Sequence, residues 1–332
     1  MVRGMATTIE HGVKAEPPQF AEHDKLGPLG GKQSVLDNEL ELRRAMVSEF
    51  ASAAEAARGA AGAADRGLSS AVHDYRKALR RARAVLAMVA HALPKSERRA
   101  VRRALREARR ALGPSRDHSV APDTLSRLGL GESDRATADA VITSAAEATP
   151  PLAEVKQLLA EGAARTAAQV EALEAALPAS IAWEVVSRGV RDVYDDARRA
   201  RKSAKRSKRA FHTWRRRSKE LTYQLRVLAG YAGPSVSQLQ REIEGATDPQ
   251  GPGVDLIMVR DFVRTYSQGA PGDAIDSLLG SIDGELDLLA KDARKVAKPA
   301  FRRKPRRFER RLTKAVRRDL APPAPDDDHH VA

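Results

Sequence analysis

The chain has 332 residues, a formal net charge of +14, only 4% aromatic residues and no cysteine. The lack of cysteine excludes disulfides, thiolate metal sites and a cysteine nucleophile. This length can bury one large core or two smaller ones, and no segment alternates with the period of a strand, so we expect an all-α fold. No segment has the length and apolarity of a signal peptide or a membrane span, and we therefore expect a cytoplasmic protein.

The sequence of the first half predicts a disordered N-terminal arm followed by a series of helices. Residues 1–33 are rich in proline and glycine and predict a disordered N-terminal arm. Ser34 is a suitable cap for the next helix, and Ser69 or Ser70 for the one after it. The predicted helices cover about 35–58, 70–93, 95–112, 120–129, 133–148 and 151–177.

Pro178 divides the chain into two helical halves, which we assign to residues 34–178 and 179–320. The second half begins with a long helix over about 181–208, and a second one ends near Tyr231. Further helices are predicted over about 235–244, 253–266, 271–296 and 305–320. Residues 321–332 form an acidic, proline-rich tail, in which Asp326 to His330 superficially resemble a metal chelator. A tail of this kind rarely provides closed coordination geometry, so we predict no metal site.

One helix pattern occurs twice, about 139 positions apart, starting at His73 and His212. Each copy has an apolar stripe that steps by three and four residues, which keeps it on one helix face. The stripes are Val72, Tyr75, Leu79, Ala82, Leu86, Val89 and Leu93 in the first copy, and Phe211, Trp214, Ser218, Leu221, Leu225 and Leu228 in the second. The duplication predicts two antiparallel helical bundles related by an approximate two-fold axis, with Tyr75 and Trp214 in the core.

The basic residues are concentrated in three blocks. Residues 72–118 contain 14 Lys and Arg against 4 Asp and Glu, residues 188–226 contain 15 against 4, and residues 291–320 contain 14 against 3. A surface that only keeps a protein in solution mixes the two signs, so this segregation indicates a site for a polyanion. Two predicted helices carry a basic flank. In the 95–112 helix it includes Arg102, Arg106 and Arg109. In the 181–208 helix it includes Arg198, Lys202 and Lys205.

These motifs resemble the CHAD domain, a histidine-containing α-helical domain. The first half carries VHDYRKALRRARAVL and then LGPSRD, and the second half carries FHTWRRRSKELTYQL and then LQREIEGATD. FRRKPRRFERRL near the C-terminus resembles the end of the family, so the resemblance covers roughly residues 35–320. It implies two helical bundles around a basic central surface that binds inorganic polyphosphate without a cofactor, and polyphosphate granules as one expected location.

Carried over by position, the resemblance places a defined set of side chains on or near that surface. Thr222, Glu220 and Thr247 depart from the family's basic pattern, which implies a smaller contribution from the second copy and compensation by Arg198, Lys202 and Lys205. The residues carried over are His73, Arg76, Lys77, Arg80, Arg83, Arg116, His212, Arg215, Arg216 and Lys219.

Three functions compete on this pattern. Arginine offers a planar fork that suits phosphate oxygens, which favours a non-catalytic polyphosphate binder. The same basic helices would attract DNA or RNA, although no helix-turn-helix signature is present and aromatic residues are scarce on the basic faces. An enzyme acting on phosphoanhydrides would need a metal clamp or a nucleophile, and no suitable carboxylate cluster lies within the basic blocks. His73 and His212 could simply pack at the margin of the core, but their equivalent positions beside arginines favour phosphate contact.

Overall fold

The computed structural model describes residue 35 and residues 37–321 of the chain. The predicted arm, Ser34, and residues 322–332 of the predicted tail lie outside these residues. Within the described part of the chain there are twelve α-helices, one short 3-10 helix and no strand, so the predicted all-α fold is confirmed. The helices are α1 (Glu39–Gly62), α2 (Leu68–Met88), α3 (Lys95–Ala111), α4 (Gly113–Ser126), α5 (Glu132–Glu147), α6 (Leu152–Ala176), α7 (Trp183–Ser203), α8 (Lys208–Ala232), α9 (Pro234–Thr247), η1 (Asp248–Gln250), α10 (Gly251–Tyr266), α11 (Gly272–Val296) and α12 (Pro305–Leu320). No described helix combines the length and the apolarity that a bilayer crossing requires.

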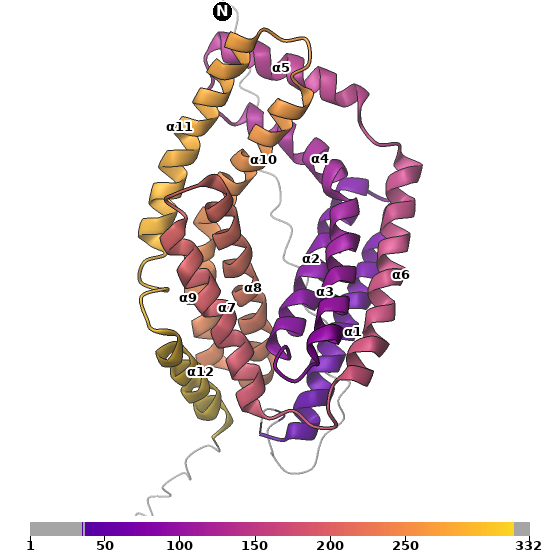
Figure 1. The fold of residues 1–332 in the computed structure, drawn as a ribbon, viewed down its shortest axis with the longest axis vertical. Coiled ribbons are helices and arrows are strands. Elements are labelled where there is room, and N and C mark those ends of the chain that lie inside the picture. The colour runs from indigo at the N-terminus through magenta and orange to yellow at the C-terminus, as the bar shows by residue number, and fades with distance from the viewer. Residues whose placement is uncertain (1–34, 36, 322–332) are drawn as a thin grey trace, which may run out of the picture. The chain divides into compact units, whose positions relative to one another are not determined.

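Helices α1, α2, α3 and α6 pack together as a first group, and α7, α8, α9 and α12 as a second (Figure 1). The two duplicated stripes supply the centre of each group. Tyr75 and Leu79 on α2 are fully buried, as are Trp214 and Leu221 on α8, which confirms that Tyr75 and Trp214 belong to the core. Burial of side chains of this size contributes roughly 1.5–3 kcal/mol each, so the stripes account for much of the packing free energy.

A third group contains two helices from each half: α4 and α5 pack against α10 and α11 (Figure 1). It has a separate hydrophobic core, which includes Leu125, Val141, Phe262 and Ile282. Polar contacts also join the halves here, because the hydroxyl of Ser277 donates to a carboxylate oxygen of Asp134 at 2.7 Å. The sequence had not indicated this group, and the approximate two-fold relation between the halves stays a prediction.

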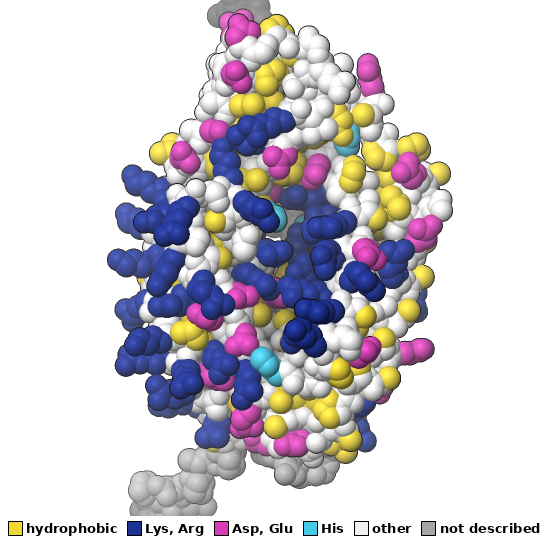
Figure 2. Space-filling model, viewed as in Figure 1, with side chains coloured by type: hydrophobic (Ala, Val, Ile, Leu, Met, Phe, Trp, Pro, Cys, Tyr) yellow, Lys and Arg dark blue, Asp and Glu magenta, His cyan; other side chains and the backbone are white. Residues whose placement is uncertain are grey.

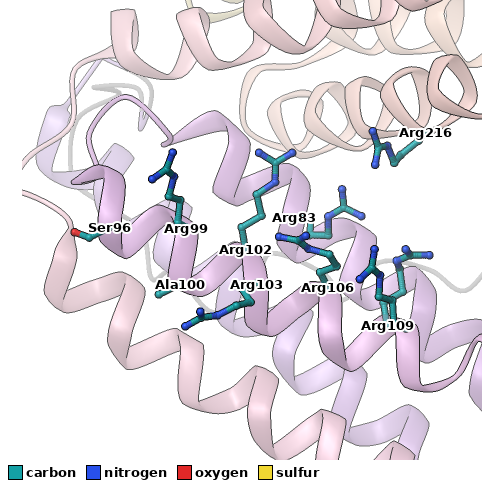
Figure 3. A pocket seen from close by; sticks show the side chains of 10 residues that line it. Arg83, Ser96, Arg99, Ala100, Arg102, Arg103, Arg106, Arg109 and Arg216 are labelled. Atoms are coloured by element: carbon teal, nitrogen blue, oxygen red, sulfur yellow. The ribbon is translucent and has the colours of Figure 1, made fainter. Parts of the chain in front are cut away.

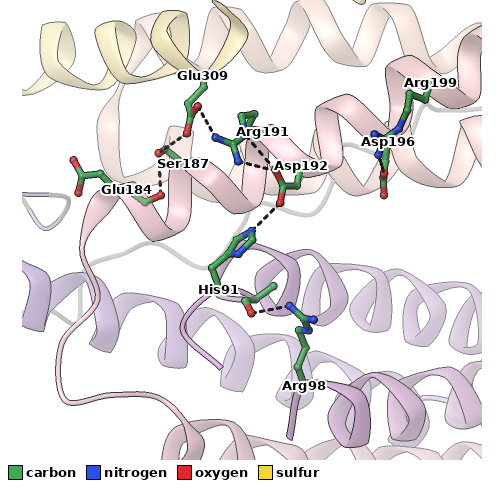
Figure 4. Close-up of polar contacts among 10 residues, drawn as sticks. His91, Arg98, Glu184, Ser187, Arg191, Asp192, Asp196, Arg199 and Glu309 are labelled. Carbon is green, nitrogen blue, oxygen red and sulfur yellow. Dashed lines mark hydrogen bonds and ion pairs between the residues drawn. The ribbon is translucent and has the colours of Figure 1, made fainter. Parts of the chain in front are cut away.

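The end of α2 is the main contact between the first and second groups. Gln224 of α8 donates from Nε2 to the carbonyl oxygen of Ala84 at 3.3 Å. Beyond the end of α2, His91 Nε2 lies 2.7 Å from Oδ2 of Asp192 on α7 (Figure 4). Gly189 of α7 lies directly against the last carbonyl groups of α2, where a Cβ atom would be 2.4 Å from the carbonyl oxygen of Met88. Only a glycine allows this approach without displacing backbone.

Several predicted helix boundaries were wrong by a few residues. The first helix begins after Asn38, whose side chain accepts from the backbone N–H groups of Leu40 and Glu41, and it continues to Gly62. The second begins at Leu68 without a side-chain cap. The helix predicted from about residue 120 begins at Gly113, because Pro114 occupies its first turn, where a missing N–H costs nothing. The helix predicted over 181–208 is shorter and covers Trp183–Ser203.

Candidate functional site

A cavity of about 190 Å³, here called the central cavity, is lined by residues of all three groups, from α2, α3, α8, α4 and α10. Figure 2 shows dark-blue side chains gathered around a hollow at this place. Both halves of the chain line it, and nine of its lining residues belong to the predicted site. These are Arg76, Arg80 and Arg83 from α2, Arg109 from α3, Arg116 from α4, and His212, Arg215, Arg216 and Lys219 from α8.

A larger cavity of about 670 Å³ adjoins the central cavity along α3 and shares Arg83, Arg109 and Arg216 with it. The predicted residues Arg102 and Arg106 line this α3 cavity. In Figure 3 their side chains reach the same side of α3 as Arg83 and the facing Arg216, whereas Arg103 turns away. Side chains spaced by three and four residues on α3 therefore form one row of guanidinium groups.

A third cavity, of about 490 Å³, continues on the other side and is here called the α10 cavity. It shares Arg76, Arg109, Arg116 and His212 with the central cavity. It adds Lys208, Arg209 and Arg260, together with the carboxylates of Asp117 and Asp261. Because neighbouring cavities share side chains, the three form one continuous basic groove.

Equivalent arginines of the two copies are anchored in the same way. Arg76 donates from Nη1 to the carbonyl oxygen of Arg109 in the last turn of α3, at 3.4 Å. Arg215 donates to the carbonyl oxygen of Thr247, the last residue of α9. The free carbonyl groups at the end of a helix carry partial negative charge and favour a cation there. These contacts hold the two guanidinium groups in place at the wall of the central cavity.

Carboxylates neutralise only part of the basic lining. Asp255 accepts from Arg116 at 2.9 Å, and Asp248 accepts from Lys219 at 2.9 Å. Glu220, the other carboxylate besides Asp255 that lines the central cavity, pairs at 2.8 Å with Arg217, which does not line this cavity. Among the described residues no ion-pair partner is found for six lining arginines. Two of them, Arg76 and Arg215, bind the backbone carbonyl groups named above, and the other four are Arg80, Arg83, Arg109 and Arg216.

Burial and mutual repulsion make these charges costly in the empty protein. Burial, followed by the positive charges of Arg116, Arg109 and Arg80, lowers the pKa of Arg76 to about 9. The pKa of Arg109 is lowered by burial and then by Arg83 and Arg80, and the pKa of Arg216 by burial and then by Arg217. A lowered pKa in a base means that its surroundings disfavour the charged form. A polyanion in the groove would remove this cost.

The two histidines differ in position. His212 lines both the central cavity and the α10 cavity, and its pKa is lowered by burial and then by Arg216 and Arg109. His73, which is exposed like His212, is not among the residues that line the central cavity. Its pKa is also lowered, by burial and then by the charge of Arg80, so it lies close to the basic lining. Whether either histidine contacts phosphate stays a prediction.

Some predicted residues are not part of the groove. Lys77 is half-buried on α2 outside the three cavities. Arg198, Lys202 and Lys205 do not line them either, and the compensation expected from these residues stays a prediction. Arg198 and Lys202 follow Tyr194 along α7, whereas Lys205 lies beyond the end of this helix. The hydroxyl of Tyr194 donates to the carbonyl oxygen of Ala300 in the segment before α12, at 3.2 Å. This stripe of α7 therefore lies on the side of α12.

The groove also contains cations outside the predicted set. Arg99, Arg103 and Arg110 line the α3 cavity and belong to the basic flank that the sequence revealed. Arg260 had no such signal, because it lies outside the three basic blocks of the sequence; it pairs with Asp283 at 2.9 Å. The packing of α10 against α4 brings Arg260 to the groove.

The basic groove ends at a fourth cavity of mixed charge, which has a volume of about 470 Å³. Arg83 and Glu220 line both this cavity and the central one. Its far wall carries three carboxylates of α7, those of Asp192, Asp195 and Asp196. These carboxylates pair with His91, Arg199 and Arg217 and neutralise part of the positive charge of this cavity, whereas no carboxylate lines the α3 cavity.

Metal-ligating groups are few in the described part of the chain. No three His, Asp or Glu side chains there come close enough together to hold a metal ion. The possible chelator at Asp326 to His330 lies outside the described residues.

The three basic cavities contain no Phe, Tyr or Trp in their lining.

Comparison with known proteins identifies the family. The comparison with curated proteins gives no match. Among solved structures, the crystal structure of the CHAD domain from the plant Ricinus communis is similar, with a TM-score of 0.59 and 16% sequence identity over 82% of this chain and 96% of that one. At this identity the likeness concerns the fold. The family model of the CHAD domain matches residues 45–264, more than half of the chain, and the protein therefore belongs to the CHAD domain family.

Proposed function

We propose that the groove formed by the three basic cavities binds inorganic polyphosphate and does not cleave it. The observation that carries this proposal is the convergence of guanidinium groups from both halves on the central cavity, six of them without an ion-pair partner among the described residues. Guanidinium groups make paired, charge-assisted hydrogen bonds to phosphate oxygens. The positive charge that is costly in the empty groove becomes favourable when phosphate occupies it.

The shape and chemistry of the groove favour a chain of phosphates over a nucleotide or a single nucleic-acid strand. Bases bind best when they stack on aromatic side chains, and no Phe, Tyr or Trp lines the three cavities. Polyphosphate offers only oxygens and one negative charge after another along an extended chain. A continuous groove with repeated arginines matches that pattern.

The proposal is tested by titrating the full-length protein with fluorescently labelled long polyphosphate at two salt concentrations. We expect tight binding that weakens steeply with salt, because each neutralised phosphate releases counterions. We also expect the melting temperature to rise as polyphosphate is added, since a ligand that binds only the folded state stabilises it. Orthophosphate release in the presence of Mg²⁺ or Mn²⁺ would contradict a non-catalytic role. Displacement of polyphosphate by ATP or single-stranded DNA at matched phosphate concentration would contradict the proposal that polyphosphate is the preferred ligand.

Polyphosphate affinity should increase several-fold as the pH falls from about 7.5 to about 5.5, because His73 and His212 become protonated on binding. In the empty protein both histidines have a pKa below 6.5. A bound polyanion stabilises the imidazolium and raises that pKa, so binding takes up protons. The same lowered pKa makes the empty protein less stable as the pH falls below 6.5, because the unfolded chain then binds more protons. Dissociation constants measured across this range should lose most of their pH dependence in a His73→Gln/His212→Gln variant.

A further inference from the structure

The C-terminal helix α12 carries a second cationic surface that the groove does not use. Every exposed residue of α12 is an arginine or a lysine, namely Arg306, Arg307, Arg310, Lys314, Arg317 and Arg318, which together are here called the α12 face. None of them has an ion-pair partner among the described residues, and none lines one of the four cavities. Figure 2 shows Lys and Arg side chains at the lower left, where Figure 1 places α12, as well as in the central hollow.

The two carboxylates of α12 do not neutralise this face, because both are engaged on the inner side. Glu309 accepts from Arg191 at 3.2 Å and from the hydroxyl of Ser187 at 3.3 Å (Figure 4). Asp319 accepts from the backbone N–H groups of Ser235 and Val236 at 2.9 and 3.1 Å, and so caps the start of α9. The acidic residues of α12 thus fix the helix to its neighbours, while the outer side carries positive charge alone.

The α12 face is also held rigidly. Phe308 is buried and stacks on Tyr194 with the ring centroids 3.9 Å apart. Trp183 donates from Nε1 to the hydroxyl of Thr313 at 3.1 Å, and Arg311 binds Glu242 of α9 at 2.7 Å. Positions fixed by packing and hydrogen bonds lose little conformational freedom when a ligand binds.

Helix stability does not explain these charges. Arg317 and Arg318 lie in the last turn, where cations interact favourably with the helix dipole, but Arg306 and Arg307 lie in the first turn, where they do not. Arg310, Lys314 and Arg318 follow at intervals of four residues, and like charges at this spacing repel each other by a few tenths of a kcal/mol. A surface that served solubility alone would mix both signs.

We propose that the α12 face binds the phosphate backbone of double-stranded nucleic acid, independently of base sequence and of the groove. A single straight helix is convex and cannot enclose a flexible chain, but it can lie along a duplex, which carries one negative charge per about 1.7 Å of its axis. The helix extends over about 24 Å. The α12 face has no aromatic residue on which a single strand could stack and no apolar residue that could enter a membrane. Contacts to phosphate alone position a protein without reading sequence.

The test compares two triple variants of the full chain, Arg306→Gln/Arg310→Gln/Lys314→Gln on α12 and Arg80→Gln/Arg83→Gln/Arg216→Gln in the groove. Each is titrated with a short labelled DNA duplex of mixed sequence and, separately, with labelled long polyphosphate. We expect the α12 variant to bind the duplex at least about tenfold more weakly than the wild type. The slope of log affinity against log salt concentration should be smaller by about 3 in magnitude. The same variant should bind polyphosphate as the wild type does. The groove variant should keep most of its duplex binding. Circular dichroism checks that both variants remain folded.

Unchanged duplex binding by the α12 variant would overturn this inference, and so would an equal loss in the groove variant. If the α12 variant instead loses binding to anionic lipid vesicles and keeps the duplex, the face serves a membrane and the inference is wrong. None of these outcomes depends on the proposed function, because polyphosphate binding is read separately and through the groove variant.

Discussion

An Arg80→Gln/Arg83→Gln/Arg216→Gln variant should bind polyphosphate about 100-fold more weakly than the wild type and yet melt at a higher temperature when empty. The loss of affinity corresponds to roughly 1 kcal/mol for each guanidinium group that no longer binds a phosphate. The gain in stability follows from the empty groove, where burial and neighbouring arginines lower the pKa of Arg83 and Arg216. Glutamine keeps a polar side chain of similar reach but removes the charge.

The opposite directions of the two effects are the informative part of this experiment. General damage to the fold would lower both the affinity and the melting temperature. Isothermal titration gives the affinity, and thermal unfolding with and without polyphosphate gives the stability. Arg76 is left in place because it is only 8% exposed and anchors the end of α3, so its replacement would disturb the fold as well.

A matched control removes three positive charges elsewhere. Arg44, Arg58 and Arg127 are exposed, and each is paired with a carboxylate three or four residues away, at 2.7, 2.8 and 3.4 Å. Exposed pairs of this kind contribute at most about 1 kcal/mol. An Arg44→Gln/Arg58→Gln/Arg127→Gln variant should therefore bind polyphosphate nearly as the wild type does. Equal losses in the two variants would mean that net charge, and not the groove, determines binding.

The sequence predicted the features that depend on local periodicity. The stripes containing Tyr75 and Trp214 are buried as their spacing indicated, because a repeat of three and four residues defines one side of a helix wherever that helix lies. The same repeat put Arg76, Arg80 and Arg83 beside the apolar stripe of α2, and their counterparts beside that of α8. Once α2 packs on α8, these flanks necessarily come together.

The features that the sequence did not predict depend on which helices become neighbours. The third group of helices is an example, since the contact of Asp134 with Ser277 joins residues 143 positions apart. Arg198 and Lys202 are spaced as regularly as the residues of α2, yet they follow Tyr194 on the side of α12, and Lys205 lies beyond the end of α7. Periodicity shows that residues share a face of a helix, but not what the face meets.

A Gly189→Ala substitution should lower the free energy of unfolding by about 1–3 kcal/mol, because it forces apart the contact between α7 and the end of α2. The new Cβ atom would lie 2.4 Å from the carbonyl oxygen of Met88 and 2.6 Å from that of Ala87. Both obstacles are backbone atoms within or beside a helix, so no side-chain rotation relieves the clash. Helix propensity alone would favour alanine by up to about 1 kcal/mol, and the expected loss is net of that gain.

Gly284 supplies the control, since it lies within α11 and a Cβ atom there would meet nothing within 4 Å. Gly284→Ala should therefore stabilise the protein, so the same substitution has opposite signs at two helical positions. Denaturant unfolding measures both. Because α2 carries Arg76, Arg80 and Arg83, a displaced α2 also moves these side chains away from α8, and Gly189→Ala should weaken polyphosphate binding although it removes no charge. A Gly189→Ala protein as stable as the Gly284→Ala protein would show that the two halves do not approach each other through this glycine.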